Sequence, residues 1–351
     1  MSTKILLVGF AVISLLMLFG CNNPNPPVTN GTNQTIPQNQ TQNQTPITII
    51  VGNQTNQTTQ TNQTKPPVVV PPVNETNLSA IEYIYDPSQP LGVYFIDVGQ
   101  PGLHGNAILI KKGDFDMLLD AGPAESAGKV KDFLTSKGLN NIDVLVSTNA
   151  DPRNYGGIGT VADNFAIQQF WWNGDARGDS TYTTLVNRLN GSVKKTLQID
   201  EGFKMDLDGI HFEVLNPADP RFMDINNDAI VMKVSDRNTS ILLTSSIQTG
   251  PQGRLINDKT INLSSTIMEA PYFGVGAGTS NINFFLLTAK PKDMIITGSS
   301  DESATNGGSR DPFKRQMKQY NITWHEVYAN GTIRVMVDGN GYNIQSLGVG
   351  Q

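Results

Sequence analysis

Cysteine and histidine are scarce in this chain of 351 residues, and both shortages limit its chemistry. The single cysteine is Cys21, which excludes an internal disulfide framework and a thiolate metal cluster in the folded part. Only three histidines are present, although imidazole is a common zinc ligand. Lysine and arginine form no cluster and the formal net charge is -6, so charge gives no support to a nucleic-acid partner.

The extreme N-terminus has the layout of an export signal. Lys4 precedes an apolar run from Ile5 to Phe19, which is shorter than the ~20 residues of a membrane-spanning helix. Leu18 to Cys21 resembles a lipobox, in which Cys21 would be the site of lipid attachment; the alternative is an uncleaved anchor. In both cases we expect residues 1–21 to tether an exported protein to the outer face of the cell membrane.

Residues 22–80 are rich in asparagine, glutamine, threonine and proline, with almost no charge and no apolar period. Such a segment buries too little apolar surface to offset its ordering entropy, so we expect a disordered stalk. Its Asn-x-Thr triplets are candidate glycan acceptors in an exported protein. They lie at Asn30, Asn33, Asn39, Asn43, Asn53, Asn56, Asn62 and Asn74.

Low-complexity sequence of this composition also produces such triplets by chance. Further acceptor triplets nevertheless fall in the expected folded part, at Asn190, Asn238, Asn262, Asn321 and Asn330. We therefore favour some glycosylation. A lipobox-like cysteine together with dense acceptors suits an archaeal cell surface.

Residues 81–351 are expected to form the folded part, which is long enough for one large core or two modest ones. Strand patterns lie at residues 93–98, 107–110, 117–120, 142–147, 209–215, 229–234, 240–244 and 293–297. Helical patterns lie at 127–137 and 310–320, and the turn Asp338-Gly339 joins a C-terminal hairpin of 332–337 and 341–345. Two strand-rich halves with intervening helices predict two packed sheets with helices outside.

Several motifs in the first half carry a family resemblance. They are the segments from Val93 to Gln100, from Asn106 to Ile110 and from Leu118 to Pro123, followed by Ile142 to Thr148 and the pair Gly156-Gly157. Together they resemble the metallo-beta-lactamase-fold domain of the DNA-uptake protein ComEC, and the resemblance extends over residues 91–344. It implies an α/β fold of the α+β type, a four-layer αββα sandwich.

The resemblance fails at the metal ligands. The metal loop of the family resembles T-H-x-D-x-D-H-x-G-G, and its ligand positions here hold Asn149, Asp151, Arg153 and Asn154, of which only Asp151 is a family ligand. The later ligand positions fall on Ser246, Tyr272, Phe273 and Ser309. The resemblance therefore implies a degenerate site with no metal cofactor and no catalytic residue, because a single carboxylate cannot hold a working zinc ion.

A non-catalytic binding or scaffold protein is thus the function we predict, with an unidentified surface ligand or protein as partner. The residues expected to line its cleft are Asp120, Asn149, Asp151, Asn154, Ser246 and Tyr272. One alternative is a metal-dependent, possibly nuclease-like hydrolase with an altered site. The other is an accessory subunit of an uptake or secretion machine.

Arg153 has two open interpretations. Its guanidinium either points inward and neutralises Asp151 or Asp120, in place of the metal charge, or points to solvent. His104 lies in a glycine-flanked loop beside the former metal mouth, where a histidine is usually exposed. Trp172 is expected in the core, with a stacking platform at the cleft rim as the alternative.

Overall fold

The computed structural model describes residues 88–99, 104–177, 179–275, 282–298 and 311–348. The expected export segment 1–21, with Cys21, lies outside the described residues, as do the stalk with its acceptor triplets and Ser309. No helix among the described residues is long and apolar enough to cross a membrane.

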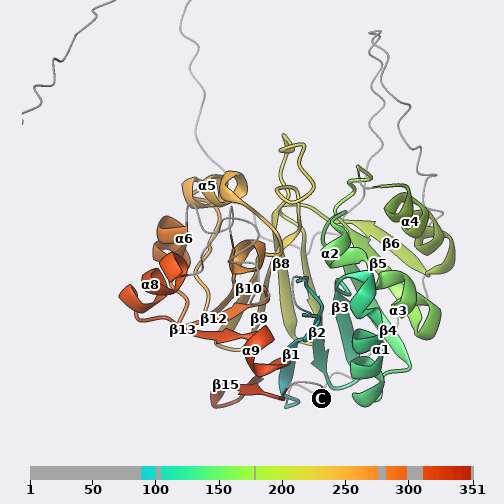
Figure 1. Cartoon of the computed structure of the whole chain (residues 1–351), viewed down its shortest axis with the longest axis horizontal. Coiled ribbons are helices and arrows are strands. Elements are labelled where there is room, and N and C mark those ends of the chain that lie inside the picture. The colour runs from blue at the N-terminus through green and yellow to red at the C-terminus, as the bar shows by residue number, and fades with distance from the viewer. Residues whose placement is uncertain (1–87, 100–103, 178, 276–281, 299–310, 349–351) are drawn as a thin grey trace, which may run out of the picture. The chain divides into compact units, whose positions relative to one another are not determined.

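Two sheets form the centre of the domain (Figure 1). The first has eight strands in the order β15 (Gly341–Ser346), β14 (Ile333–Asp338), β1 (Leu91–Phe95), β2 (Ile108–Lys112), β3 (Phe115–Leu119), β4 (Asn141–Ser147), β5 (Ala166–Trp172) and β6 (Lys195–Gln198). The second has seven, in the order β13 (Thr323–Glu326), β12 (Asp293–Ile296), β11 (Ile267–Glu269), β10 (Thr239–Leu243), β9 (Val231–Asp236), β8 (Ile210–Asn216) and β7 (Lys204–Leu207).

Helices cover the outer faces of both sheets. On the first sheet lie α1 (Ala127–Ser136), α3 (Ile158–Asn164) and α4 (Ser180–Ser192), and on the second lie α5 (Thr249–Asn257), α6 (Ile282–Ala289) and α8 (Asp311–Gln319). The short helices are η1 (Ala124–Ser126), α2 (Pro152–Tyr155), η2 (Pro271–Gly274) and α9 (Val327–Asn330). The layers therefore run helix, sheet, sheet, helix, as the sequence predicts.

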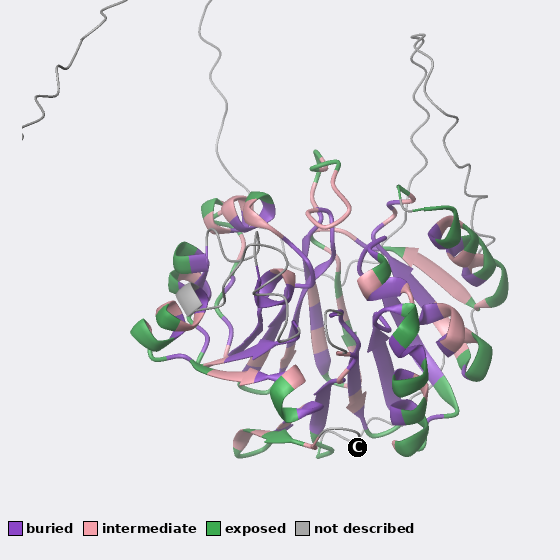
Figure 2. Cartoon of the chain, viewed as in Figure 1, coloured by how far each residue is buried: buried purple, intermediate pink, exposed green. Residues whose placement is uncertain are grey.

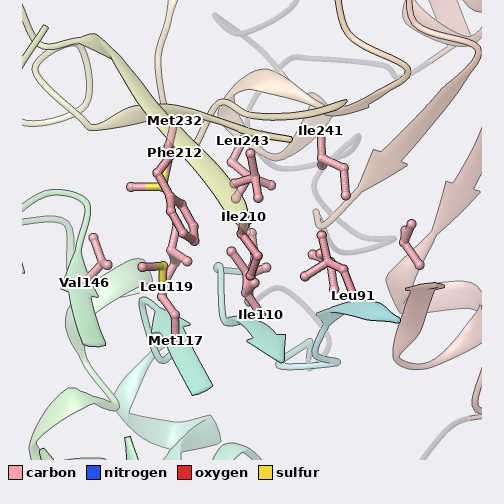
Figure 3. Packing of buried hydrophobic residues seen from close by; sticks show 14 of the residues in the cluster. Leu91, Ile110, Met117, Leu119, Val146, Ile210, Phe212, Met232, Ile241 and Leu243 are labelled. Carbon is pink, nitrogen blue, oxygen red and sulfur yellow. The ribbon is translucent and has the colours of Figure 1, made fainter. Parts of the chain in front are cut away.

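Alternation of buried side chains along the strands explains this layering. In β10, Ile241 and Leu243 pack between the two sheets, whereas Leu242 packs beneath the helices of the second sheet. Figure 3 shows the inter-sheet core, where Phe212 and Met232 meet side chains of the first sheet. Because both faces of the central strands are buried, as the purple strands of Figure 2 show, these segments are continuous apolar runs in the sequence.

The predicted strands and helices are confirmed within a few residues. The predicted strand 142–147 is β4, and the predicted helix 127–137 is α1, which ends before Gly138 at φ +77°. This conformation favours glycine, which explains why the helix ends there. Trp172 is buried at 5% exposure under the helices of the first sheet, so it belongs to the core and not to a cleft rim.

One ion pair joins the two sheets through the apolar interior. Lys112 Nζ of β2 lies 3.1 Å from Asp236 Oδ1 of β9, and both side chains are almost completely buried. A buried charge needs such a partner because burial removes its hydration. The pair therefore couples the two sheets at the β2 and β9 strands.

Candidate functional site

The candidate site lies where the carboxyl ends of parallel strands from both sheets meet. The loops that build it follow β3, β4, β10 and β11, and β4 runs parallel to β3 just as β11 runs parallel to β10. Thr148, which follows β4, bridges the sheets, because its hydroxyl lies 2.8 Å from that of Ser245, which follows β10. Ligand sites of α/β proteins commonly form at such carboxyl ends.

Asp120 is the innermost acid of the first sheet. It follows β3 with φ +56° and is 1% exposed, and its carboxylate accepts hydrogen bonds from the Thr148 backbone N–H (2.8 Å) and the Thr148 hydroxyl (2.6 Å). Burial raises the pKa of Asp120 to about 8 against the effect of these bonds, and the charges of Glu269 and Asp151 act in the same direction as burial. Within the described part of the chain, Arg153 pairs with Asp151 and not with Asp120.

Asp151 caps α2 and pairs with Arg153. Its Oδ1 accepts the backbone N–H of Arg153 at 2.9 Å, with Pro152 at the first helical position, where proline is favoured. The Arg153 guanidinium then folds back onto the same carboxylate, with Nε 2.9 Å from Oδ1 and Nη2 bonded to Oδ2. This bidentate pair is a strong form of ion pair, and its acid is only 6% exposed.

The rest of the guanidinium is enclosed by three side chains. Nη1 lies 2.7 Å from His104 Nε2, and Nη2 donates to the Tyr272 hydroxyl at 3.3 Å. Its central carbon lies 5.0 Å from the Tyr272 ring centre and 4.9 Å from that of Phe273, within the range of a cation–π contact. Arg153 therefore points inward, and of the two acids considered it pairs with Asp151.

His104 corrects a prediction. The sequence indicated an exposed loop histidine, but His104 is 5% exposed and its ring packs edge-on against Phe273 with centroids 4.4 Å apart. Since the guanidinium can only donate hydrogen bonds, His104 Nε2 accepts from Arg153 as the neutral imidazole. The neighbouring Gly105 permits this packing, because a Cβ there would lie 2.0 Å from the Arg153 carbonyl oxygen.

Asn149, Asn154 and Ser246 form a neutral network beneath Arg153, and none of the three has measurable exposure. Asn149 Nδ2 donates to Ser246 Oγ at 2.6 Å, and Asn149 Oδ1 accepts from Asn154 Nδ2 at 3.0 Å. The same oxygen accepts the backbone N–H of Asp151 at 3.2 Å. The Asn149 amide oxygen, at a position that the resemblance assigns to a metal ligand, thus already accepts two hydrogen bonds.

Tyr272 and Phe273 occupy a strained turn in η2, with φ +49° and +60°. Residues other than glycine rarely adopt such positive φ values, so packing must hold the turn in place. Phe273 is fully buried, whereas Tyr272 is partly exposed. Of the six residues expected to line a cleft, only Tyr272 reaches solvent to a useful extent, because the other five are buried.

Glu269 is a buried acid of the site that the sequence analysis missed. It ends β11 at 1% exposure, and its Oε2 accepts the backbone N–H groups of Thr244 (2.8 Å) and Ser245 (2.9 Å). Burial raises the pKa of Glu269 to about 7, although these bonds and the neighbouring Asn106 amide lower it. The signal in the sequence was an acid inside the apolar run before Ala270-Pro271.

The residues present do not fit the metal ion of the family that the sequence resembles. Asp151 shares its carboxylate with a permanent cation, the amide of Asn149 is satisfied by its neighbours, and an imidazole reaches the site only to accept from Arg153. Among the described residues, no group of three or more histidine, cysteine, aspartate or glutamate side chains is placed to hold a metal ion. A divalent ion at Asp151 would meet the guanidinium charge directly.

No protein-family profile matches the chain. In sequence it is similar to the competence protein ComA of Neisseria gonorrhoeae, with 23% identity over 212 residues, which are 60% of this chain and 27% of ComA. The chain therefore spans about a quarter of the length of this relative.

Solved structures similar to the chain include the metallo-beta-lactamase fold protein YhfI of Bacillus subtilis, at 12% identity and a TM-score of 0.47, covering 68% of this chain and 96% of YhfI. Igni18, a metallo hydrolase of Ignicoccus hospitalis, is 10% identical with a TM-score of 0.46, covering 70% and 98% of the two chains. The four-layer architecture confirms the predicted αββα sandwich, and the sequence similarity to ComA supports the resemblance of its motifs to the ComEC type of metallo-beta-lactamase-fold domain.

Proposed function

We propose that this chain is an exported, membrane-tethered binding or scaffold protein whose metallo-beta-lactamase-type domain does not catalyse hydrolysis. The observation that carries the proposal is the position of the Arg153 guanidinium. It is paired with Asp151, bonded to His104 and Tyr272, and stacked on two aromatic rings at the place where the family resemblance puts metal ligands.

Hydrolysis in this fold depends on a metal-bound water whose pKa is lowered towards neutrality. Arg153 contributes the positive charge that the acids of the site require, but a guanidinium has no open coordination position and cannot activate water. Asp151 is engaged by Arg153, and burial holds Asp120 in its neutral form near pH 7, so neither acid is a free general base. The ion pair and the neutral carboxyl group therefore stabilise the packing of the site and leave neither acid free to activate water.

We expect a ligand to bind at the solvent-exposed side of the site. Asn149, Asn154 and Ser246 are buried, so a macromolecular ligand meets Tyr272 and the partly exposed edge of Arg153 first. These two side chains offer an aromatic face and guanidinium donors, which suit a polar surface ligand. The export signal and stalk predicted from residues 1–80 support a location outside the membrane.

The similarity to ComA favours one rival, an accessory subunit of a DNA-uptake machine. In that case the chain is held in a larger membrane assembly and does not act alone. Purification of the full chain from detergent-solubilised membranes distinguishes the two: a stoichiometric complex that survives gel filtration supports the subunit, and a single species supports the solitary binder.

Metal content of the purified full chain tests the main proposal. We expect zinc and manganese well below one ion per chain after incubation with either metal, and no hydrolysis of phosphodiester or β-lactam substrates. Stoichiometric metal together with activity that disappears in Asp151→Ala would overturn the proposal. Asp163→Ala is the matched control, because Asp163 is an exposed acid of α3 with 62% side-chain exposure.

A further inference from the structure

Five Asn-x-Ser/Thr triplets fall in the part of the chain that the structure describes, and their surroundings differ sharply. A transferase that glycosylates a folded protein must reach both the asparagine amide and the hydroxyl two residues further on. Exposure of both groups, and a local turn that brings them together, therefore separates usable acceptors from chance triplets.

Asn262 meets both conditions. It lies in the connection between α5 and β11, and both Asn262 and Ser264 are exposed. Its Oδ1 accepts the backbone N–H of Ser264 at 3.0 Å, which forms an Asx turn. The turn holds the Asn262 side chain against the backbone of Ser264, and both residues are open to solvent.

Asn321 meets the exposure condition and lies in a turn. It lies between α8 and β13 with φ +56°, a conformation that asparagine tolerates better than most residues, and both Asn321 and Thr323 are exposed. A surface hollow lies beside it, lined by Lys318, Asn321, Ile322, Thr323 and Trp324. The partly exposed Trp324 offers an aromatic face against which a first sugar ring can pack.

In each of the other three triplets, either the hydroxyl or the asparagine amide is buried or already hydrogen-bonded. Asn330 is exposed, but Thr332 is 3% exposed and its Oγ1 accepts the Asp97 backbone N–H at 3.1 Å. Asn190 lies inside α4 with its Oδ1 buried. Asn238 lies in the β9–β10 turn, but its partner hydroxyl sits within β10, where it accepts the Thr266 N–H at 3.3 Å.

We propose that Asn262 and Asn321 are N-glycosylation sites of the folded domain and that Asn190, Asn238 and Asn330 are not. The donor is a polyprenyl-phosphate-linked oligosaccharide. The asparagine Nδ2 forms a bond to the anomeric carbon, the bond from that carbon to the phosphate oxygen breaks, the phosphate leaves with the electron pair, and the amide loses one proton to a base of the transferase.

Both sites precede parallel strands, in the connections that enter β11 and β13 at their amino ends. The candidate functional site lies at the carboxyl ends of β3, β4, β10 and β11. Glycans on Asn262 and Asn321 therefore do not cover the exposed surface of Arg153 and Tyr272, where we propose that the ligand binds. The inference rests on the export that is part of the proposed function.

Mass spectrometry of the full chain, purified from the cells that make it, tests the assignment. Trypsin releases Asn321 and Asn330 in one peptide, residues 319–334, which makes one position the internal control of the other. We expect a glycan on Asn321 and none on Asn330, with fragmentation that retains the sugar locating it. Absence of a glycan from both Asn262 and Asn321, or a glycan on Asn190, Asn238 or Asn330, overturns the proposal.

Variants give a second readout on the intact protein. Ser264→Ala and Thr323→Val each remove an acceptor hydroxyl at an exposed position and should each remove the mass of one glycan, whereas Asn330→Gln should leave the mass of the attached sugar unchanged. Protease digestion of intact cells measures export separately. An accessible chain without these glycans rejects the site assignment alone, and a protected chain also rejects the export.

Discussion

Arg153 determines the chemistry of the site more than any other residue. It lies where the resemblance predicts a ligand carboxylate, and its side chain supplies a fixed charge to a group of acids that would otherwise repel one another. His104 and Phe273 hold the guanidinium in place through a hydrogen bond and a stacked ring. The site thus holds a fixed positive charge at a position that the resemblance assigns to a metal ligand.

Replacement of Arg153 by alanine is expected to lower the free energy of unfolding by about 1–3 kcal/mol, because it leaves the carboxylate of Asp151 buried without its partner. This loss of stability is smaller than for a fully buried pair, because 24% of the Arg153 side chain is exposed to solvent. Urea unfolding measures it. Arg188→Ala, which breaks a solvent-exposed pair with Asp163, should cost less than about 1 kcal/mol; equal effects of the two substitutions would contradict an internal role for Arg153.

At the scale of elements, the loop between β8 and β9 presents apolar side chains to solvent beside the site. It is the yellow loop that projects beyond the sheets in Figure 1, and it exposes 39% of Phe222 and 72% of Met223. Asp228 anchors it: the carboxylate accepts the backbone N–H groups of Phe222 (2.8 Å) and Met223 (2.9 Å) and binds Arg177. These bonds hold Met223 at φ +60°, a conformation that its side chain disfavours.

Asp228→Ala is expected to release this loop while the sheets stay folded, because it removes the acceptor of two backbone donors. Amide hydrogen exchange at Phe222 and Met223 should become at least about tenfold faster, which corresponds to about 1.4 kcal/mol of local stability. Asp219→Ala is the control, since that side chain is 88% exposed. Unchanged exchange rates at both amides in Asp228→Ala would show that other contacts hold the loop.

At the scale of the whole molecule, the two sheets bring together acids that are far apart in the sequence. Asp120 comes from the first sheet and Glu269 from the second, and both are about 99% buried, so each loses the hydration that stabilises its charge. Their pKa values of about 8 and about 7 lie above the ordinary values of 3.8 and 4.5. Ionisation of these carboxyls therefore opposes the closed packing of the sheets.

The stability of the domain is consequently expected to depend on pH. Between about pH 4 and pH 8 the folded chain holds more protons on these two carboxyls than the unfolded chain, so the free energy of unfolding falls as the pH rises. Their contribution is fully present below about pH 4 and is lost as the pH rises through about 7 to 8.

Urea unfolding of Glu269→Gln at several pH values from 5 to 8 checks this effect. The amide keeps the shape and the acceptor oxygen but cannot ionise, so the loss of stability across this range should be smaller than in the parent by about 1–3 kcal/mol. Asp132→Asn, at a side chain that is 75% exposed, should keep the slope of the parent. Parallel curves for the parent and Glu269→Gln would mean that Glu269 does not titrate in this range.

The sequence determined the elements whose pattern is local. Strand β4 could be predicted because both of its faces are buried, which makes every residue from Ile142 to Val146 except Asp143 apolar. The end of α1 could be predicted because Gly138 supplies the left-handed conformation that stops a helix. The residues at the positions that the resemblance assigns to metal ligands could also be read from the sequence, because neighbouring motifs align those positions.

Only the tertiary structure decided what fills the site. The partner of Arg153, the burial of His104 and the presence of Glu269 depend on loops that follow strands of two different sheets. The physical reason is that the charge state and exposure of a side chain depend on which distant segments exclude water from it, and no periodicity along the chain records those contacts. The same packing that buried these groups leaves Asn262 and Asn321 exposed to solvent.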